Sequence, residues 1–309
     1  MDHQLTVDTG PAPGAAGQKS DLAALAGAYL ELTKPRIVLL IVITGLCAML
    51  LAAHGWPSTW LVIWTMLGLF LSAGGANAVN MWYDRDIDPL MERTRERPVP
   101  SGRLSAVQAL TFGIGAGVAA TAVLFLAAGW VAAASGLAGY LYYVFIYTMW
   151  LKRRTPQNIV IGGAAGAFPP LVGWAAVTGH LALAPVLLFL IIFLWTPPHF
   201  WALALYRQDD YRRAAIPMLP VVAGDRATKW QSLLYAVALL ASSLLLYTTG
   251  TVSALYLWAA AVLGGGFIVV CSLQLFEHPP DFRWARITFR YSLLYLALLF
   301  AVMVMSVRA

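Results

Sequence analysis

The chain has 309 residues, of which 60% are hydrophobic and 11% are charged, and its mean hydropathy is +0.73. These values exclude a water-soluble globular protein and are typical of a polytopic membrane protein. The net charge of +6 does not indicate nucleic-acid binding, because membrane proteins concentrate Lys and Arg in their inner loops.

Residues 1–30 are rich in Gly, Ala and Pro and lack the apolar core of a signal peptide. We expect them to form a disordered cytoplasmic tail ahead of one transmembrane domain at residues 31–309. Asp2, Asp8 and Asp21 argue against an organellar transit peptide, which is poor in acids. A bacterial inner membrane is therefore the expected location.

Nine apolar runs are long enough to cross a bilayer, which takes about 20 residues of helix. The sequence therefore predicts an all-α fold with nine transmembrane helices. They are expected at 36–54, 59–83, 106–126, 130–150, 157–178, 182–206, 229–249, 252–275 and 287–307.

The distribution of charge predicts how these helices are oriented. If the N-terminus is cytoplasmic, every Lys and Arg except Arg308 belongs to an inner segment, and the loops at 54–59, 127–130, 178–184 and 249–253 carry no charge. The positive-inside rule then places the N-terminus inside and the C-terminus outside. All acidic residues also lie inside, where topology does not require them, so we expect chemistry at the cytoplasmic face.

The second apolar run ends in a polar and acidic cluster. On a helix, Asn80, Asp84 and Asp88 fall within about 80° of one another, whereas Asp86 points away. Oxygen ligands with two carboxylates suit Mg²⁺, which fills its other positions with water and phosphate oxygens. The cluster therefore predicts a Mg²⁺ site that takes a phosphorylated ligand.

Two groups of basic residues lie on the same side. The loop at 89–103 holds four arginines and three prolines, and Lys152, Arg153 and Arg154 end the fourth predicted helix. Arginine forks match phosphate oxygens. The alternative is that both groups only set topology at the lipid headgroups. Beside a stripe of carboxylates, diphosphate binding is the favoured interpretation.

Asn158 and the pair Gly162 and Gly163 open the next predicted helix, which is rich in Gly and Ala. Small residues allow two backbones to approach closely, or leave room for a bulky ligand.

The sixth predicted helix contains two prolines followed by His199. If the helix continues past the prolines, His199, Tyr206 and Asp210 lie within about 40° of one another on one face. A histidine in a membrane helix is often only a hydrogen-bonded packing residue, but its position near the acidic side favours function here. We therefore expect an imidazole, a phenol and a carboxylate to face one space.

With these residues, the chain resembles the intramembrane prenyltransferase superfamily. Its NDxxDxxxD signature is matched at Asn80, Asp84 and Asp88, with Met81 in the second place. Within the superfamily the chain is similar to the haem-modifying branch, and the resemblance extends from about Thr33 to the C-terminus. The segments that carry it include MERTRERPVPSGRLS, WTPPHFW and DYRRAAIPMLP.

The resemblance implies nine helices around a central cavity that holds Mg²⁺ and farnesyl diphosphate. The farnesyl diphosphate would lose diphosphate, the allylic cation would add to a vinyl group of haem b, and water would complete the side chain of haem O. Haem-modifying or terminal-oxidase assembly proteins are the expected partners. The expected diphosphate ligands are Arg93, Arg97, Lys152 and Arg153, and the expected contacts of the haem are His199, Tyr206 and Asn158.

The second acidic motif departs from the superfamily pattern. A DxxxD form is usual, whereas this chain has Tyr206-Arg207-Gln208-Asp209-Asp210 and lacks the first aspartate. Two alternatives stay open. Either Asp209 and Asp210 bind a second Mg²⁺, or Asp210 orients Lys152 or an arginine.

Two rival functions are a membrane transporter and a prenyltransferase with another aromatic or tetrapyrrole acceptor. A transporter predicts polar residues on both faces of the membrane. The acids of this chain lie on one side only, and the PPHFW and DYRRAAIPMLP segments favour haem as the acceptor.

Overall fold

The computed structural model describes residues 15–307, and these are almost entirely helical. They form no strand beyond an isolated antiparallel bridge between Val252 and Val307. The long helices are α2 (Pro35–Ala52), α3 (Thr59–Tyr83), α4 (Ala106–Leu141) with its π-helical continuation η2 (Tyr142–Leu151), α7 (Leu183–Leu205), α10 (Gly224–Leu245) with η4 (Leu246–Thr249), α11 (Ala254–Gln274) and α12 (Arg283–Met305). A further span is assembled from α5 (Asn158–Gly162), η3 (Gly163–Ala167) and α6 (Pro169–Thr178), and the shorter elements are α1 (Ala15–Leu32), η1 (Asp88–Leu90), α8 (Gln208–Arg213) and α9 (Leu219–Val222).

Eight helical stretches in the described residues are long and apolar enough to cross a membrane. The longest, Ala106–Leu151, has 46 residues and is interrupted at Gly129, whose φ of 84° and ψ of 175° are not helical. The chain reverses direction at Gly129. Two contacts between the halves show this: the Tyr140 hydroxyl donates to the Gly113 carbonyl (2.9 Å), and the Tyr140 ring packs on Gly117. This stretch therefore accounts for two of the predicted helices, 106–126 and 130–150.

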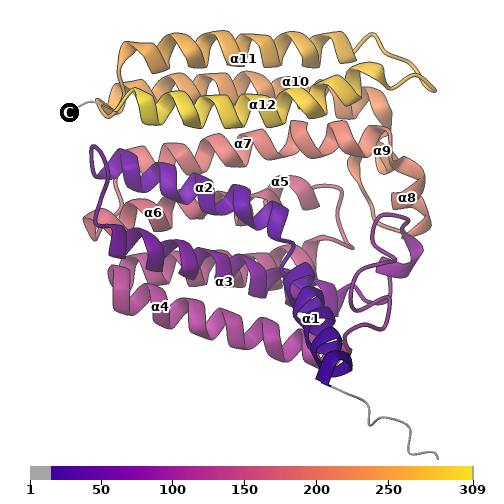
Figure 1. Cartoon of the computed structure of the whole chain (residues 1–309). Helices are drawn as coiled ribbons and strands as arrows, with labels where there is room; N and C mark the ends of the chain where they lie inside the picture. Colours follow the sequence, from indigo (N-terminus) through magenta and orange to yellow (C-terminus); the bar gives the residue numbers. More distant parts are fainter. Residues whose placement is uncertain (1–14, 308–309) are drawn as a thin grey trace, which may run out of the picture.

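The long helices run roughly parallel to one another (Figure 1). Helices α10, α11 and α12 lie on one side of the bundle and α3 and α4 on the other, with α2, α6 and α7 between them. Helices α1, α8 and α9 gather at one end (Figure 1), which is the end where the charged loops lie. The bundle therefore has one charged end and one end with short uncharged connections.

The N-terminal segment differs from the expected tail of residues 1–30, because α1 occupies its second half. Near its end, Ala28 and Leu32 are buried and the ring of Tyr29 packs on Phe112, with 5.2 Å between the centroids. This apolar contact attaches the helix to the bundle. Residues 1–14, where the tail prediction also falls, lie outside the described residues.

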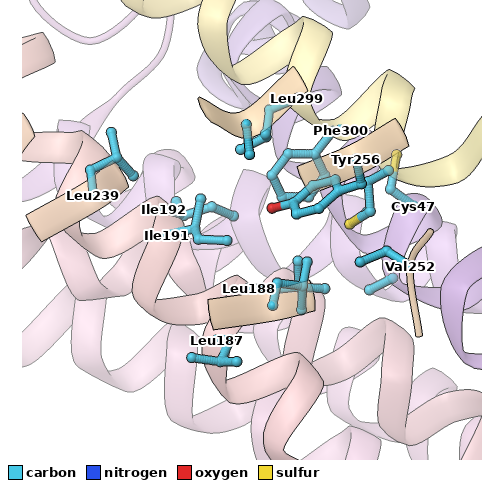
Figure 2. Packing of buried hydrophobic residues seen from close by; sticks show 14 of the residues in the cluster. Cys47, Leu187, Leu188, Ile191, Ile192, Leu239, Val252, Tyr256, Leu299 and Phe300 are labelled. Atoms are coloured by element: carbon cyan, nitrogen blue, oxygen red, sulfur yellow. The ribbon is translucent and has the colours of Figure 1, made fainter. Parts of the chain in front are cut away.

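A large apolar core joins α7 to the C-terminal helices. Figure 2 shows Leu188 and Ile192 of α7 near Leu299 and Phe300 of α12, with the ring of Tyr256 from α11 beside them. All five side chains are buried. This packing holds α7 in place, and α8 follows it directly at the charged end.

Candidate active site

The site begins where α3 ends. The helix stops at Tyr83, yet Asp84 N–H donates to the Asn80 carbonyl (2.9 Å) and Asp88 N–H to the Asp84 carbonyl (2.9 Å). These bonds span four residues, so Asn80, Asp84 and Asp88 keep nearly helical spacing, and all three side chains are buried. Asp86, which the spacing separates from these three, is exposed.

The carboxylate of Asp84 is neutralised by cations from the end of η2. The Lys152 ammonium donates to one of its oxygens, and Arg153 Nη2 donates to the other (3.2 Å). The Asn80 amide also donates to Asp84 (2.7 Å). A buried carboxylate without such partners would lose several kcal/mol of hydration, so these bonds allow it to stay charged away from water.

Arg153 lies further out, because its guanidinium also binds exposed Asp86 (2.6 and 2.7 Å) and covers the ring of Tyr83. The Arg153 bond lowers the pKa of Asp86 below its usual value.

Asp88 is held by the loop that follows it. Arg97 Nη1 lies 3.0 Å from each of its carboxylate oxygens, and the Thr94 hydroxyl donates to its backbone carbonyl (2.6 Å). The basic loop therefore folds back onto the acidic cluster. Arg97, one of the residues expected to bind phosphate, binds the carboxylate of Asp88 in this structure.

A cavity of about 140 Å³ lies beside Asn80 and Asp88. Its charged lining consists of one carboxylate, Asp88, and four cations, and this surplus of positive charge favours a ligand with several negative charges. The cations are Lys34, Arg93, Arg97 and Lys152. The rest of the wall is mainly apolar or aromatic and includes Ile37, Met91, Tyr143, Tyr147, Ile159, Phe200, Tyr211, Ile216 and Met218.

Lys34 is a site residue that the sequence analysis missed. It lies just before α2, in a left-handed conformation with φ 55°, and its ammonium donates to Asn80 Oδ1 (2.9 Å). Burial lowers its pKa well below the usual value, and the nearby charges of Arg97 and Lys152 lower it further. A lysine directly ahead of the proline that starts the first apolar run was the available signal.

The turn between α1 and α2 is held in place by Asn77 of α3. The Asn77 amide donates to the Thr33 carbonyl (3.1 Å), and its oxygen accepts from the Tyr143 hydroxyl (3.2 Å). Since Thr33 directly precedes Lys34, this contact fixes where the ammonium enters the cavity.

The π-helix η2 supplies the opposite wall. Lys152 N–H donates to the Tyr147 carbonyl, five residues back (2.9 Å), and the Thr148 hydroxyl accepts from the Asn80 amide (3.2 Å). A Cβ on Gly162 would lie 2.1 Å from the Tyr147 ring. The space left by the missing side chain of Gly162 is therefore occupied by the ring of Tyr147, which lines the cavity.

The two aspartates of the second motif do not line this cavity. Asp209 is exposed and binds Arg212 (3.0 Å), whereas the buried carboxylate of Asp210 binds Arg213 and lies 3.9 Å from Arg207. The orienting role proposed for Asp210 therefore involves arginines of its own segment, and no bond joins it to Lys152 in the described residues.

Tyr211, the next residue, lines the cavity in their place. Arg93 Nη2 donates to its hydroxyl (3.2 Å), and the Arg93 guanidinium lies 5.3 Å from the ring centroid. Burial raises the pKa of Tyr211, so the phenol is protonated at neutral pH.

Helix α7 continues past its two prolines but ends at Leu205, and Asp210 belongs to the separate helix α8. The single helical face predicted for His199, Tyr206 and Asp210 is therefore wrong, because the backbone leaves the helical conformation at Tyr206 and Arg207.

His199 Nδ1 is 2.7 Å from the Ser292 hydroxyl, and the ring is stacked between Trp195 (4.3 Å) and Phe289 (4.7 Å). Tyr206 also packs on Phe289 (6.5 Å). Neither residue lines the cavity beside Asp88, and contact with haem stays a prediction for both.

Asn158 does line the cavity, and it is buried. Its amide donates to the Lys152 carbonyl (3.3 Å), but its Oδ1 has no hydrogen-bond partner in the described part of the chain.

The described residues contain no group of three His, Cys, Asp or Glu side chains able to hold a metal alone. The side-chain oxygens of Asn80, Asp84 and Asp88, together with the unpartnered Oδ1 of Asn158 in the cavity lining, fit Mg²⁺, which binds few protein ligands and completes its shell with water and phosphate.

A membrane bundle with a basic, carboxylate-bearing cavity at its charged end is suited to transferring a group from an organic diphosphate. The chain belongs to the UbiA prenyltransferase family, whose model matches residues 41–305. It is 58% identical over 279 residues to the protoheme IX farnesyltransferase of Symbiobacterium thermophilum, with 90% of this chain and 93% of that protein covered. The protein of the same name from Gloeobacter violaceus is 51% identical, with 91% and 92% covered.

A third relative with this name, from a Roseiflexus species, is 51% identical over 89% of this chain, which spans only 51% of that longer protein. Among solved structures, a digeranylgeranylglyceryl phosphate synthase is similar with a TM-score of 0.77 at 19% identity, covering 91% of this chain and 98% of that one. A UbiA homologue from Archaeoglobus fulgidus bound to DMAPP and Mg²⁺ has a TM-score of 0.61 at 16% identity, covering 89% and 98%. The family resemblance and the helical membrane fold predicted from the sequence are thus confirmed.

Proposed function

We propose that this protein transfers the farnesyl group of farnesyl diphosphate to a vinyl group of haem b, with addition of water, giving haem O and diphosphate. The observation that carries the proposal is the cavity at the charged end, where four cations surround the buried Asn80 and Asp88. The shared name of the close relatives supports farnesyl as the transferred group and haem as the acceptor. Enzymes that use or further modify the product would be its partners.

In this proposal, Asn80, Asp84 and Asp88 would hold Mg²⁺, and the charge of the bound ion would lower the cost of breaking the allylic C–O bond as diphosphate leaves. The Archaeoglobus fulgidus neighbour was solved with a prenyl diphosphate and Mg²⁺ together, which is consistent with this assignment.

The basic residues clamp the diphosphate. Lys34, Arg97 and Lys152 now bind Asn80, Asp88 and Asp84, so each has a charge-assisted donor that a phosphate oxygen can compete for. These bonds keep the donors at the cavity before the substrate arrives, so that only an exchange of partners is needed for them to stabilise the charge that develops on the leaving group. Arg153 binds Asp84 and Asp86 and does not line the cavity, so its role in this proposal is to position the carboxylate of Asp84.

The apolar and aromatic wall protects the farnesyl cation. Ile159, Phe200 and Met218 give the cavity an apolar lining that disfavours water, and the aromatic rings of Tyr143 and Tyr147 in the same lining are groups that can attract a cation. The charge distribution of the loops supports a chamber at the cytoplasmic side, and the membrane proposed for it is a bacterial inner membrane.

The test is incubation of the purified protein in lipid nanodiscs with Mg²⁺, haem b and farnesyl diphosphate, followed by mass analysis of the haem. We expect haem that has gained one farnesyl group and one hydroxyl group, the second hydrogen of the water being released as a proton, and none of this product when EDTA is present. A parallel reaction that replaces haem with a quinone-precursor ring checks the acceptor. Prenylation of the ring alone, or no product at all, would refute the proposal.

A further inference from the structure

Asp209 and Asp210 lack the geometry of a divalent-metal site. Their carboxylates belong to adjacent residues of α8, yet the side chain of Asp209 is 83% exposed and that of Asp210 only 6%. Two ligands of one Mg²⁺ must converge within a small octahedron. These two point to different surroundings, and neither lines the cavity that contains Asp88.

The charge around the second motif also opposes a cation. Asp209 binds Arg212, and Asp210 has Arg213 and Arg207 beside it. Three guanidinium groups therefore face two carboxylates, so the segment offers no surplus of negative charge. The acidic cluster at Asp84 and Asp88 differs, because Asp88 itself lines the cavity, and so do two of the three cations that bind the cluster, Arg97 and Lys152.

Tyr211 is the residue of this motif that reaches the cavity. It is 4% exposed, and it packs among the apolar residues Met91, Ile159 and Ile216. Its hydroxyl accepts a hydrogen bond from Arg93 and donates to no acceptor in the described part of the chain. A phenol carries one donor hydrogen, so that hydrogen is available to a ligand.

Asp210 has a structural part in this arrangement. Its bonds to Arg213 and Arg207 join the two ends of α8, and Ile216 N–H donates to the Tyr211 carbonyl (3.0 Å) just beyond the helix. These contacts hold the short helix α8 in the position where Tyr211, the residue after Asp210, lines the cavity.

We infer that the site holds one Mg²⁺ rather than two, and that the Tyr211 hydroxyl, oriented by Arg93, donates a hydrogen bond to the diphosphate in place of a second metal ion. The inference rests on the proposed function of the cavity as a diphosphate site. It assigns a binding role to a phenol and removes Asp209 from the metal ligands.

The number of ions is tested with Mn²⁺, which prefers the same oxygen ligands as Mg²⁺ and is visible by electron paramagnetic resonance. The purified protein is titrated with Mn²⁺ in the presence of inorganic diphosphate. We expect one bound ion per chain, unchanged in Asp209→Asn and lost in Asp88→Asn. Two ions in the parent protein, falling to one in Asp209→Asn, would overturn the inference.

The role of the phenol is tested with Tyr211→Phe, which keeps the ring and removes the hydroxyl. Calorimetric titration with inorganic diphosphate and Mg²⁺ should show affinity lowered about tenfold or more, as expected for a hydrogen bond to a charged group. Tyr235→Phe, which removes a half-exposed hydroxyl from α10 outside the cavity lining, is the matched control and should bind as the parent does. Equal affinity in Tyr211→Phe and the parent would overturn the role.

Both tests use inorganic diphosphate, so they do not depend on the acceptor. A parent protein that binds one ion with diphosphate, but farnesylates no haem, would refute the proposed function and support the inference. A protein that farnesylates haem with two bound ions would refute the inference alone.

Discussion

The charged side chains of the site are mutually dependent. Asp84 and Asp88 are fully buried, and each carboxylate is bound by at least one cation that also lines the cavity. A buried ion pair contributes little net stability compared with an apolar pair of similar volume. These charges are therefore better explained by the proposed function, in which a cation exchanges its carboxylate partner for a phosphate of the substrate.

The first prediction concerns Asp88. Replacing it in Asp88→Asn removes a metal ligand while keeping the shape of the side chain, so we expect Mg²⁺-dependent farnesyl transfer to fall at least about 100-fold, the order seen when a preorganised charge-stabilising group is lost. Glu92→Gln is the control, since Glu92 is exposed and does not line the cavity. Turnover is measured on membrane-folded protein, and near-normal rates in Asp88→Asn would contradict the metal assignment. We expect Asp84→Asn to behave in the same way.

The second prediction concerns Lys34. In Lys34→Met, the site loses a donor to the diphosphate, and the KM for farnesyl diphosphate should rise about tenfold or more, since hydrogen bonds to charged groups contribute about 1.5–3 kcal/mol. The KM for haem should not change. Arg85→Met removes an equal charge from an exposed position nearby and serves as the control. Steady-state kinetics with each substrate varied in turn would disprove the role of Lys34 if both variants matched the parent.

The residues of the site could be predicted where type and spacing carry the chemistry. Asn80, Asp84 and Asp88 follow from helical spacing beside an apolar run, and the arginines from their position after it. Lys34 and Tyr211 could not be found in this way, because their relation to the cavity depends on the packing of distant segments. The sequence likewise drew attention to Asp209 and Asp210, whereas in the structure the next residue, Tyr211, lines the cavity.

At the scale of helices, close contacts between small residues set the distances in the bundle. Helices α2 and α6 approach so closely that a Cβ on Gly173 would lie 2.1 Å from the Gly45 carbonyl oxygen. Membrane helices rely on such packing, because lipid gives apolar side chains no reason to prefer one another.

The third prediction follows from this contact. Gly173→Ala should push α2 and α6 apart and destabilise the fold by about 1–3 kcal/mol, the usual cost of overpacking. Gly115→Ala is the control, because a methyl group added to Gly115 in helix α4 would have nothing within 4 Å of it, and alanine there favours the helix by up to about 1 kcal/mol. Thermal unfolding in detergent measures both. A melting temperature for Gly173→Ala at or above that of Gly115→Ala would contradict the packing argument.

Helices could be predicted from the sequence wherever an apolar run of sufficient length was present. The ends of α3 at Tyr83 and of the predicted helix at 130–150 agree with the structure to within a residue. The π-helical form of η2 and the helix α1 were not foreseen, because the first depends on packing against Gly162 and the second on two buried apolar contacts in a segment of low complexity.

Across the whole molecule, the two ends differ in chemistry. The charged end contains the cavity and the basic loops, whereas the other end has uncharged connections flanked by exposed tryptophans. Tryptophan is enriched where a membrane protein meets the headgroup region. The exposed tryptophans at the uncharged end are Trp56, Trp60, Trp130 and Trp258.

The fourth prediction is that the charged end, and with it the cavity, faces the cytoplasm. The native Cys47 and Cys271 are buried, so a cysteine introduced at the surface can be labelled against a low background. Ser58 lies at the uncharged end and Glu96 in the basic loop, and both are exposed. A membrane-impermeant maleimide should therefore label Ser58→Cys in right-side-out vesicles and Glu96→Cys only in inverted ones, because Lys and Arg are retained inside during insertion. The opposite pattern would place the diphosphate cavity on the outer side of the membrane and would contradict the topology.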